Sequence, residues 1–154
     1  MKLLVVAIGH RMPGWVDAAF GEYAGRMPRE ARIELVALKP APRGGPAQRL
    51  LRNEGDRMLA ALPARCVKVA LDERGTLLDS RDLSRRIARW QTEGQDVAFL
   101  IGGADGLDAA VKQSASLVWS LSPLTLPHGL ARVLLAEQLY RAVSILHNHP
   151  YHRE

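Results

Sequence analysis

Short apolar runs alternate with amphipathic segments along the whole chain, and this alternation constrains the fold more than any other feature. Apolar runs with the length and composition of strands cover residues 2–8, 31–38, 65–71, 96–101 and 117–121. Segments with helical periodicity cover residues 14–24, 46–62, 80–93, 107–114 and 130–147. Strand–helix alternation predicts an α/β fold with a mostly parallel sheet and helices on both of its faces.

The length and composition predict a single domain over residues 1–154. The chain is 47% hydrophobic and 24% charged, which is typical of a globular protein with a real core. The segment 39–46 is rich in Pro and Gly and carries cations. Because it falls between an expected strand and an expected helix, we interpret it as a loop rather than a domain boundary.

Charge and cysteine content point to a cytoplasmic protein with a polyanionic partner. Lys and Arg number 21 against 16 acidic residues, a balance that suits nucleic acid without identifying it. The lone cysteine, Cys66, excludes an internal disulfide and fits a reducing compartment. The apolar run 3–8 is too short for the core of a signal peptide, and no stretch approaches the length of a membrane span. We therefore expect no membrane association.

Two loops in the last third of the chain predict a ligand pocket. The first carries Gly102-Gly103 directly after an apolar run, and the second covers residues 120–129. Adjacent loops at strand ends build pockets in α/β proteins, although Gly102-Gly103 alone is also explained by a tight turn. Neither a dinucleotide fingerprint nor a phosphate loop is present. Leucines, hydroxyls and prolines in the second loop favour a flat heterocycle that carries a short polar chain.

The last expected helix predicts a homodimer, because its apolar surface is wider than the stripe that one contact needs. Arg132 lies within this apolar arc and must have an anionic partner or several acceptors. Two interpretations stay open for it: an ion pair in the dimer interface, or a ligand for nucleic-acid phosphate or a cofactor carboxylate. His128, at the start of the helix, is a candidate base, polar anchor or helix cap.

The histidine-rich tail favours contact with RNA over metal binding. The spacing of His147, His149 and His152 does not reproduce an established zinc pattern, and no cysteine lies nearby. Tyr151 offers a ring that stacks on a base, and Arg153 offers a guanidinium for phosphate. We therefore expect no metal site.

Several motifs of this chain together resemble one family, the bacterial methyltransferases that act on N3 of a pseudouridine in 23S rRNA, minimal members of the SPOUT class. The motifs lie at residues 12–16, 54–55, 101–107, 121–128, 132, 135–142 and 148–154. The chain departs from the family pattern in two places: Ala104-Asp105 stands where many relatives have Pro-Glu, and Gly129 follows His128 where Pro or Gln is common.

The resemblance implies a C-terminal trefoil knot, a homodimer and S-adenosylmethionine held in the knot. It implies that the substrate is a pseudouridine in a stem-loop of 23S rRNA, at the subunit interface of the assembled ribosome. By position, the cofactor-binding residues would be Leu71, Gly102, Gly103, Leu121, Ser122, Pro123, Leu124, Thr125 and Leu126.

In this reaction N3 must lose a proton and attack the methyl group, so a proton acceptor is expected. The candidates for acceptor or positioning group are His128 and His152, and the expected RNA contacts are Arg132, Arg153 and Tyr151. Whether the tail serves its own pocket or that of a partner stays open. The alternatives are a non-enzymatic ribosome-binding factor on the same fold and a His-dependent phosphate-ester hydrolase.

Overall fold

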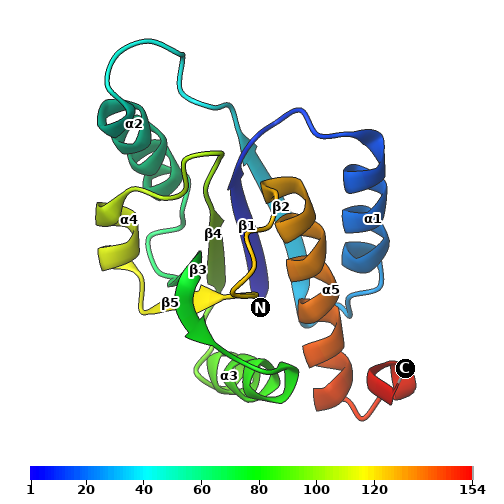
Figure 1. Ribbon diagram of the computed structural model, residues 1–154. Coiled ribbons are helices and arrows are strands. Elements are labelled where there is room, and N and C mark those ends of the chain that lie inside the picture. Colours follow the sequence, from blue (N-terminus) through cyan, green and yellow to red (C-terminus); the bar gives the residue numbers. More distant parts are fainter. Residues whose placement is uncertain (154) are drawn as a thin grey trace.

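Five parallel strands form one sheet in the order β2-β1-β4-β3-β5 (Figure 1). The computed structural model describes residues 1–153, so Glu154, the last residue of the tail motif, lies outside the described part. The strands are β1 (Lys2–Ile8), β2 (Arg32–Leu38), β3 (Val67–Leu77), β4 (Val97–Ile101) and β5 (Leu117–Ser120). The helices are α1 (Gly14–Gly25), α2 (Ala47–Ala60), α3 (Ser80–Thr92), α4 (Ala109–Ser114), α5 (His128–Leu146) and the 3-10 helix η1 (Pro150–Arg153). The expected α/β fold is confirmed.

Helices cover both faces of the sheet, as the alternation predicted (Figure 1). Successive residues of a strand point to opposite faces, so Leu3 and Val5 of β1 pack with α1, α3 and α5, whereas Leu4 and Val6 pack with α2 and α4. The strands of such a sheet are apolar on both sides, and β4 is buried along its whole length. This doubly covered sheet is the rigid base from which the loops at its carboxyl end project.

Strand β3 continues to Leu77, beyond the expected end at residue 71. Its pairing with β5 shifts in register between Leu71 and Thr76, so the residues between them form a bulge. The sequence did not predict this extension, because three charged residues followed by Gly75 form a pattern that is typical of a turn. A Cβ on Gly75 would lie 2.6 Å from the carbonyl oxygen of Val118, so only glycine allows the bulge to lie this close to β5.

Helix α5 begins at His128 and packs against α1, α3 and the sheet (Figure 1). Leu135 and Leu139 are fully buried, as the helical pattern predicted. Ser144 is also buried, and its hydroxyl donates to the carbonyl oxygen of Tyr140. That local hydrogen bond lets a serine occupy the core side of a helix. None of the helices in residues 1–153 combines the length and apolar character needed to cross a membrane.

Candidate functional site

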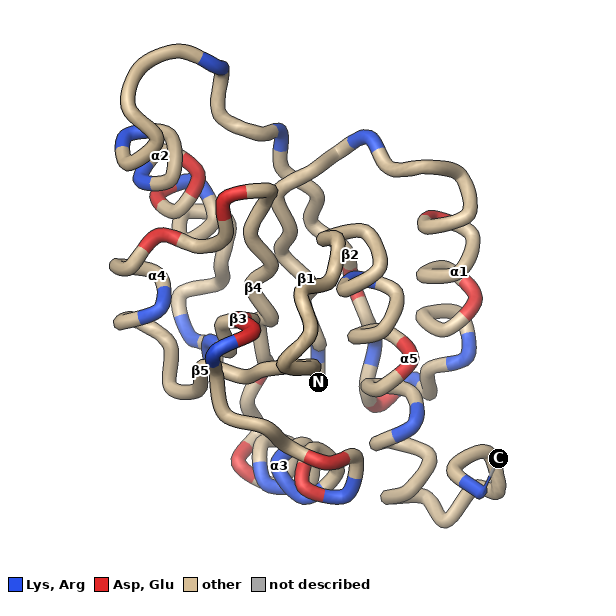
Figure 2. The backbone as a smooth tube through the Cα atoms, viewed as in Figure 1, with Lys and Arg blue, Asp and Glu red and all other residues tan. Residues whose placement is uncertain are grey.

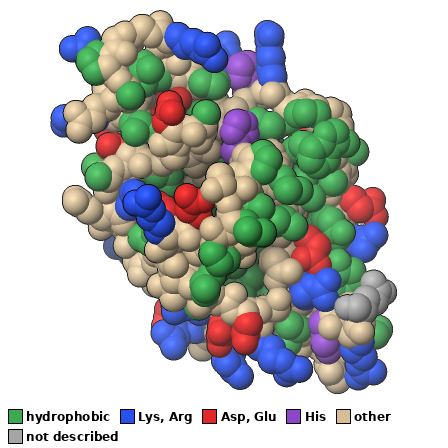
Figure 3. Space-filling model, viewed as in Figure 1, with side chains coloured by type: hydrophobic (Ala, Val, Ile, Leu, Met, Phe, Trp, Pro, Cys, Tyr) green, Lys and Arg blue, Asp and Glu red, His purple; other side chains and the backbone are tan. Residues whose placement is uncertain are grey.

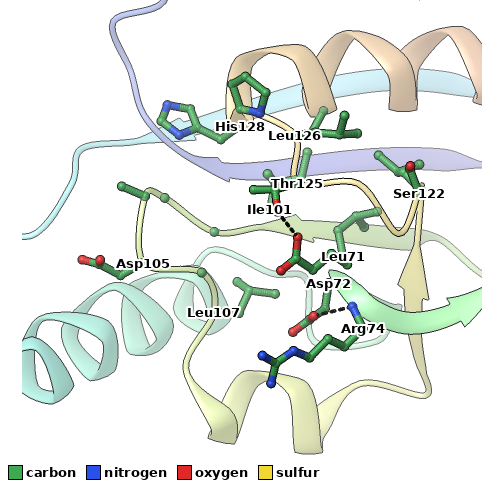
Figure 4. Close-up of a pocket in the computed structure, with 18 of the residues that line it drawn as sticks. Leu71, Asp72, Arg74, Ile101, Asp105, Leu107, Ser122, Thr125, Leu126 and His128 are labelled. Carbon is green, nitrogen blue, oxygen red and sulfur yellow. Dashed lines mark hydrogen bonds between the residues drawn. The ribbon is translucent and has the colours of Figure 1, made fainter.

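A cavity of about 830 Å³ lies at the carboxyl ends of β4 and β5 and beside the bulge of β3 (Figure 4). Three chain segments form most of its wall: the bulge of β3 (71–74), the β4–α4 loop (101–107) and the β5–α5 connection (121–128). The two loops that the sequence analysis singled out therefore meet in one pocket. Parallel strands end at the same edge of a sheet, which is why loops far apart in sequence converge here.

Eight of the nine expected cofactor-binding residues line this cavity: Leu71, Gly102, Gly103, Leu121, Ser122, Leu124, Thr125 and Leu126. The ninth, Pro123, does not line the cavity and is exposed. The backbone N–H of Leu124 donates to the hydroxyl of Ser122, and this short turn has Pro123 at its apex. A cofactor contact of Pro123 therefore stays a prediction that the shape of this cavity does not support.

The β4–α4 loop is both a tight turn and a wall of the pocket. Gly106 has a φ of +81° and its N–H donates to the carbonyl of Gly103 at 3.1 Å. A Cβ on Gly102 would overlap the backbone carbonyl of Gly106, so the turn closes only with glycine at this position. The tight turn is confirmed, and the same loop lines the cavity.

The bulge of β3 carries carboxylates that are held in place by specific partners. Asp72 accepts a hydrogen bond from the backbone N–H of Arg74 at 2.8 Å (Figure 4). It accepts a second one from the ammonium of Lys112 at 3.1 Å. Burial raises the pKa of Asp72, but these two donors outweigh burial and hold the pKa below its ordinary value. The neighbouring Glu73 accepts a 2.7 Å hydrogen bond from the hydroxyl of Thr125. The carboxylate of Asp72 therefore stays charged near neutral pH.

A second cavity, of about 300 Å³, adjoins the first. The two share Gly103, Ala104, Asp105 and His128 as a common wall. The rest of the second cavity comes from the β1–α1 turn, the cationic loop 39–46 and α2. In the space-filling view, histidine side chains lie at the upper border of the hollowed region (Figure 3). Asp105, one of the departures from the family pattern, thus contributes to both cavities.

His128 stands at the first position of α5, between the two cavities. Its Nε2 lies 3.6 Å from the position that a Cβ on Gly9 would occupy, so the imidazole reaches the β1–α1 turn. The adjacent Gly129 lets α5 approach this region closely, since a Cβ there would lie 3.3 Å from the sulfur of Met12. Of the expected catalytic residues, His128 is the one that the structure brings to the pocket.

Arg132 is buried, with 1% of its surface exposed, as its place in the apolar arc predicted. Its Nη2 donates to the carbonyl oxygen of Gly9 at 2.8 Å, and its Nε has no hydrogen-bond partner among the described residues. Burial lowers the pKa of this guanidinium. Within the chain the side chain ties α5 to the β1–α1 turn, and the expected phosphate contact stays a prediction.

The tail residues Tyr151, His152 and Arg153 line neither cavity. They form η1, which folds back along α5: Tyr151 donates to Glu137 Oε1 at 3.0 Å and packs edge-on against Tyr140. Burial, followed by this hydrogen bond, raises the pKa of Tyr151. Glu137 lies about 14 Å along the helix from His128, given the rise per residue of an α-helix. Within one chain, the tail is thus held away from the pocket.

Sequence reasoning missed several residues of these cavities, among them Asp72, Glu73, Lys112 and Glu54. Asp72 and Glu73 were missed because the bulge that carries them was not predicted. Glu54 lies in the motif at residues 54–55, for which the sequence predicted no role. Its Oε2 accepts a hydrogen bond from the backbone N–H of Ala41 at 2.9 Å. Within residues 1–153, no group of three or more potential ligand side chains is placed to hold a metal.

Comparison with known proteins gives a consistent result along the whole chain. A family model described as "Predicted SPOUT methyltransferase" matches residues 1–152. The ribosomal RNA large subunit methyltransferase H of Nitrosospira multiformis is 56% identical over 155 residues, and that of Ralstonia nicotianae is 57% identical, each alignment covering 99% of both chains.

Among solved structures, a probable methyltransferase from Bordetella pertussis aligns with a TM-score of 0.60 at 20% identity, covering 92% of this chain and 93% of that one. A probable methylase family protein from Haemophilus influenzae aligns with a TM-score of 0.58 at 13% identity, covering 97% of this chain and 69% of that one. These two structures support the fold alone. The family model and the curated relatives lead to one conclusion: this chain belongs to the SPOUT methyltransferase family.

Proposed function

We propose that this protein transfers a methyl group from S-adenosylmethionine to N3 of a pseudouridine in 23S rRNA, in a stem-loop at the subunit interface of the assembled ribosome. The observation that carries the proposal is the convergence of the two motif-bearing loops on one pocket with His128 at its border. The names of the curated relatives support a large-subunit rRNA substrate. The formal charge of +5 supports a polyanionic partner.

The residues of the larger cavity fit S-adenosylmethionine. Its volume, about 830 Å³, lies within the range of pockets that enclose ligands of this size. Leu71, Leu121 and Leu126 offer an apolar wall for a flat heterocycle, and Asp72 offers a charged carboxylate for hydroxyl and ammonium groups. The absence of side chains at Gly102 and Gly103 leaves the backbone open to close approach. When bound, S-adenosylmethionine supplies a methyl group activated by a sulfonium.

The protein's own contribution is orientation and removal of a proton. The doubly covered sheet holds the pocket walls rigid, and fixed geometry between two reactants supplies a large part of a transfer rate. We assign Nε2 of His128 as the acceptor for the N3 proton, because this imidazole borders both cavities and an imidazole nitrogen can accept a proton.

We also propose the knotted, dimeric and cytoplasmic state that the resemblance implies. β5 lies at one edge of the sheet, while α5 packs on the face near β1 and β4, so the connection between them must cross the carboxyl ends of the strands (Figure 1). Such a crossing is a prerequisite for a knot. Trp15 and Leu124 are 57% and 71% exposed, and apolar side chains gather over the region of α1 and α5 (Figure 3). An exposed apolar surface of this kind supports a second copy of the chain as partner.

In the dimer, we propose that the tail of one protomer acts at the pocket of the other. The supporting observation is that η1 lies away from the pocket of its own chain, against Glu137 and Tyr140 of α5. The proposed tail contacts are Tyr151 as a surface for stacking and Arg153 as a phosphate contact, with His152 as a positioning group. Mixing His128→Ala and His152→Ala protomers tests this: activity regained in mixed dimers supports action across the interface.

The decisive experiment is single-turnover methyl transfer to intact ribosomes with labelled S-adenosylmethionine, followed by mapping of the label. Label at N3 of one pseudouridine in 23S rRNA is the expected result. Binding of ribosomes without transfer would favour the non-enzymatic factor. Full rates in both His128→Ala and His152→Ala would remove the assignment of a histidine acceptor.

A further inference from the structure

The second cavity has the position and size of a site for the base that receives the methyl group. It encloses about 300 Å³ and shares the wall formed by residues 103–105 and His128 with the larger cavity. A base in the second cavity would therefore lie next to a donor in the first. We infer that this cavity holds the target base, and that Glu54 distinguishes pseudouridine from uridine by accepting its extra N–H. This inference rests on the function proposed above.

Glu54 is held so that one carboxylate oxygen is committed and the other is available. Oε2 accepts from the backbone N–H of Ala41 at 2.9 Å, which anchors the loop 39–46 to α2. Among the described residues, Oε1 has no hydrogen-bond partner. It lies 4.0 Å from the position that a Cβ on Gly103 would occupy, and Gly103 belongs to the wall that the two cavities share. A half-buried carboxylate oxygen with no donor is an acceptor that a ligand can satisfy.

Gly55, which follows Glu54, allows a close contact between two helices that holds Glu54 in position. A Cβ on Gly55 would lie 2.9 Å from Cγ2 of Val111 and 3.1 Å from Cβ of Asp108, so glycine at this point lets α2 pack directly against α4. The Glu54-Gly55 pair thus combines a close helix contact with a carboxylate directed at the cavity. This gives a role to a motif that the cofactor pocket leaves unexplained.

A single carboxylate is enough to distinguish pseudouridine from uridine, because the two bases differ in one donor on the ring edge. When uridine and pseudouridine are superposed on their glycosidic bonds, N3 and both carbonyl groups coincide. The one difference on the ring edge is an N1–H donor in pseudouridine where uridine has a C5–H. An acceptor at that edge gains a hydrogen bond with pseudouridine, and with uridine it is left unpaired and partly desolvated.

The surroundings of the cavity suit a nucleotide of an RNA chain. Two exposed cations line the cavity: Arg11 on the β1–α1 turn and Arg43 on the loop 39–46. The exposed imidazole of His10 lies beside Arg11 and lines it as well. Lys and Arg positions mark both of these connections, while acidic positions mark the β4–α4 side (Figure 2). Cations at the rim fit phosphates on either side of a base that enters the cavity.

The test compares methyl transfer by wild type and Glu54→Gln on two ribosome preparations, one with pseudouridine and one with uridine at the target position. In Glu54→Gln the amide oxygen still accepts from Ala41, so the loop stays anchored, but an NH₂ donor replaces the free acceptor. We expect the single-turnover rate on pseudouridine to fall roughly tenfold to a hundredfold, the range for a lost hydrogen bond to a charged group. The rate on uridine should stay within about twofold, since uridine makes no such bond.

Asp56→Asn is the matched control, because Asp56 is exposed on the same helix and the change removes the same charge. Its ratio of pseudouridine to uridine rates should equal that of wild type. Calorimetric binding of S-adenosylmethionine verifies the folded pocket in each variant, and Glu54→Asp replaces Glu54→Gln if the latter does not bind the cofactor.

An unchanged ratio in the Glu54 variant, or an equal loss on both ribosomes, would overturn the role of Glu54 while the proposed function stands. Equal wild-type rates on both ribosomes would overturn it as well. If wild type labels neither preparation, the proposed function itself fails and takes the inference with it.

Discussion

Thr125 donates a 2.7 Å hydrogen bond to the carboxylate of Glu73, a residue 52 positions earlier in the chain. This contact joins the β5–α5 connection to the bulge of β3 and spans the wall of the larger cavity (Figure 4). Both side chains are exposed, so the bond is expected to order a flexible loop more than to stabilise the fold.

Replacement of Thr125 by Val should weaken cofactor binding because the β5–α5 connection loses this tie. A hydrogen bond of this kind contributes about 1 kcal/mol, which corresponds to about a fivefold rise in Kd. Isothermal titration with S-adenosylmethionine measures it. Thr76→Val, an exposed change on the same strand as Glu73, is the control and should leave Kd unchanged. An unaltered Kd in Thr125→Val would show that the contact does not order the pocket.

Gly102→Ala should disrupt the β4–α4 turn, since its Cβ would overlap the carbonyl of Gly106. The backbone must move, and we expect loss of measurable cofactor binding with a destabilisation of about 1–3 kcal/mol, the cost of a misplaced core contact. Titration and denaturant unfolding report the two effects. Gly21→Ala, in α1 with open space around the new Cβ, should instead stabilise by about 0.5–1 kcal/mol. Normal cofactor binding by Gly102→Ala would contradict the prediction that cofactor binding requires this turn.

Gly103→Val should weaken cofactor binding less than Gly102→Ala does, because it must displace only the side chain of Ile8.

Arg132→Met should separate stability from activity. One buried guanidinium with a single carbonyl partner gains little stability, because burial disfavours its charge. We expect the free energy of unfolding to change by less than about 1 kcal/mol. The β1–α1 turn, however, loses its link to α5, and methyl transfer should fall at least about tenfold through mispositioning. Urea unfolding together with single-turnover rates tests both. A large loss of stability with intact activity would assign Arg132 to the fold alone.

Asp72 should make part of the stability depend on acid pH. Its pKa in the folded protein lies below the ordinary value of 3.8, so the unfolded chain takes up a proton at higher pH than the folded protein does. The stabilisation is therefore complete above the ordinary pKa and is lost as pH falls through the lower folded pKa. Asp72→Asn should cost about 1 kcal/mol or less near pH 7 and nothing below the folded pKa. Unfolding curves between pH 2 and about pH 7 measure this, and a constant difference over that range would contradict it.

The sequence predicted the parts of this structure that follow from local pattern. Strand β4 is an uninterrupted apolar run and helix α5 has strong periodicity, so both were found close to their observed bounds. The two pocket loops were found because Gly and Pro mark them and because parallel strands end at one edge.

The rest depends on contacts between distant residues. The bulge of β3 was missed because Gly75 is explained only by the approach of Val118, which no local pattern reveals. The partner of Arg132 is a backbone carbonyl at Gly9, and a carbonyl leaves no trace in a sequence. The hydroxyl of Tyr151 donates to Glu137, 14 positions earlier, a pairing that no local pattern reveals. Burial could be predicted for Arg132, but the identity of its neighbour could not.

The partition between the two cavities is only a short turn, residues 103–105, together with one imidazole. A ligand in either cavity would therefore contact residues that also line the other cavity. Any effect that a ligand in one cavity has on affinity in the other is matched by an equal effect in the reverse direction, because linkage between two ligands is reciprocal.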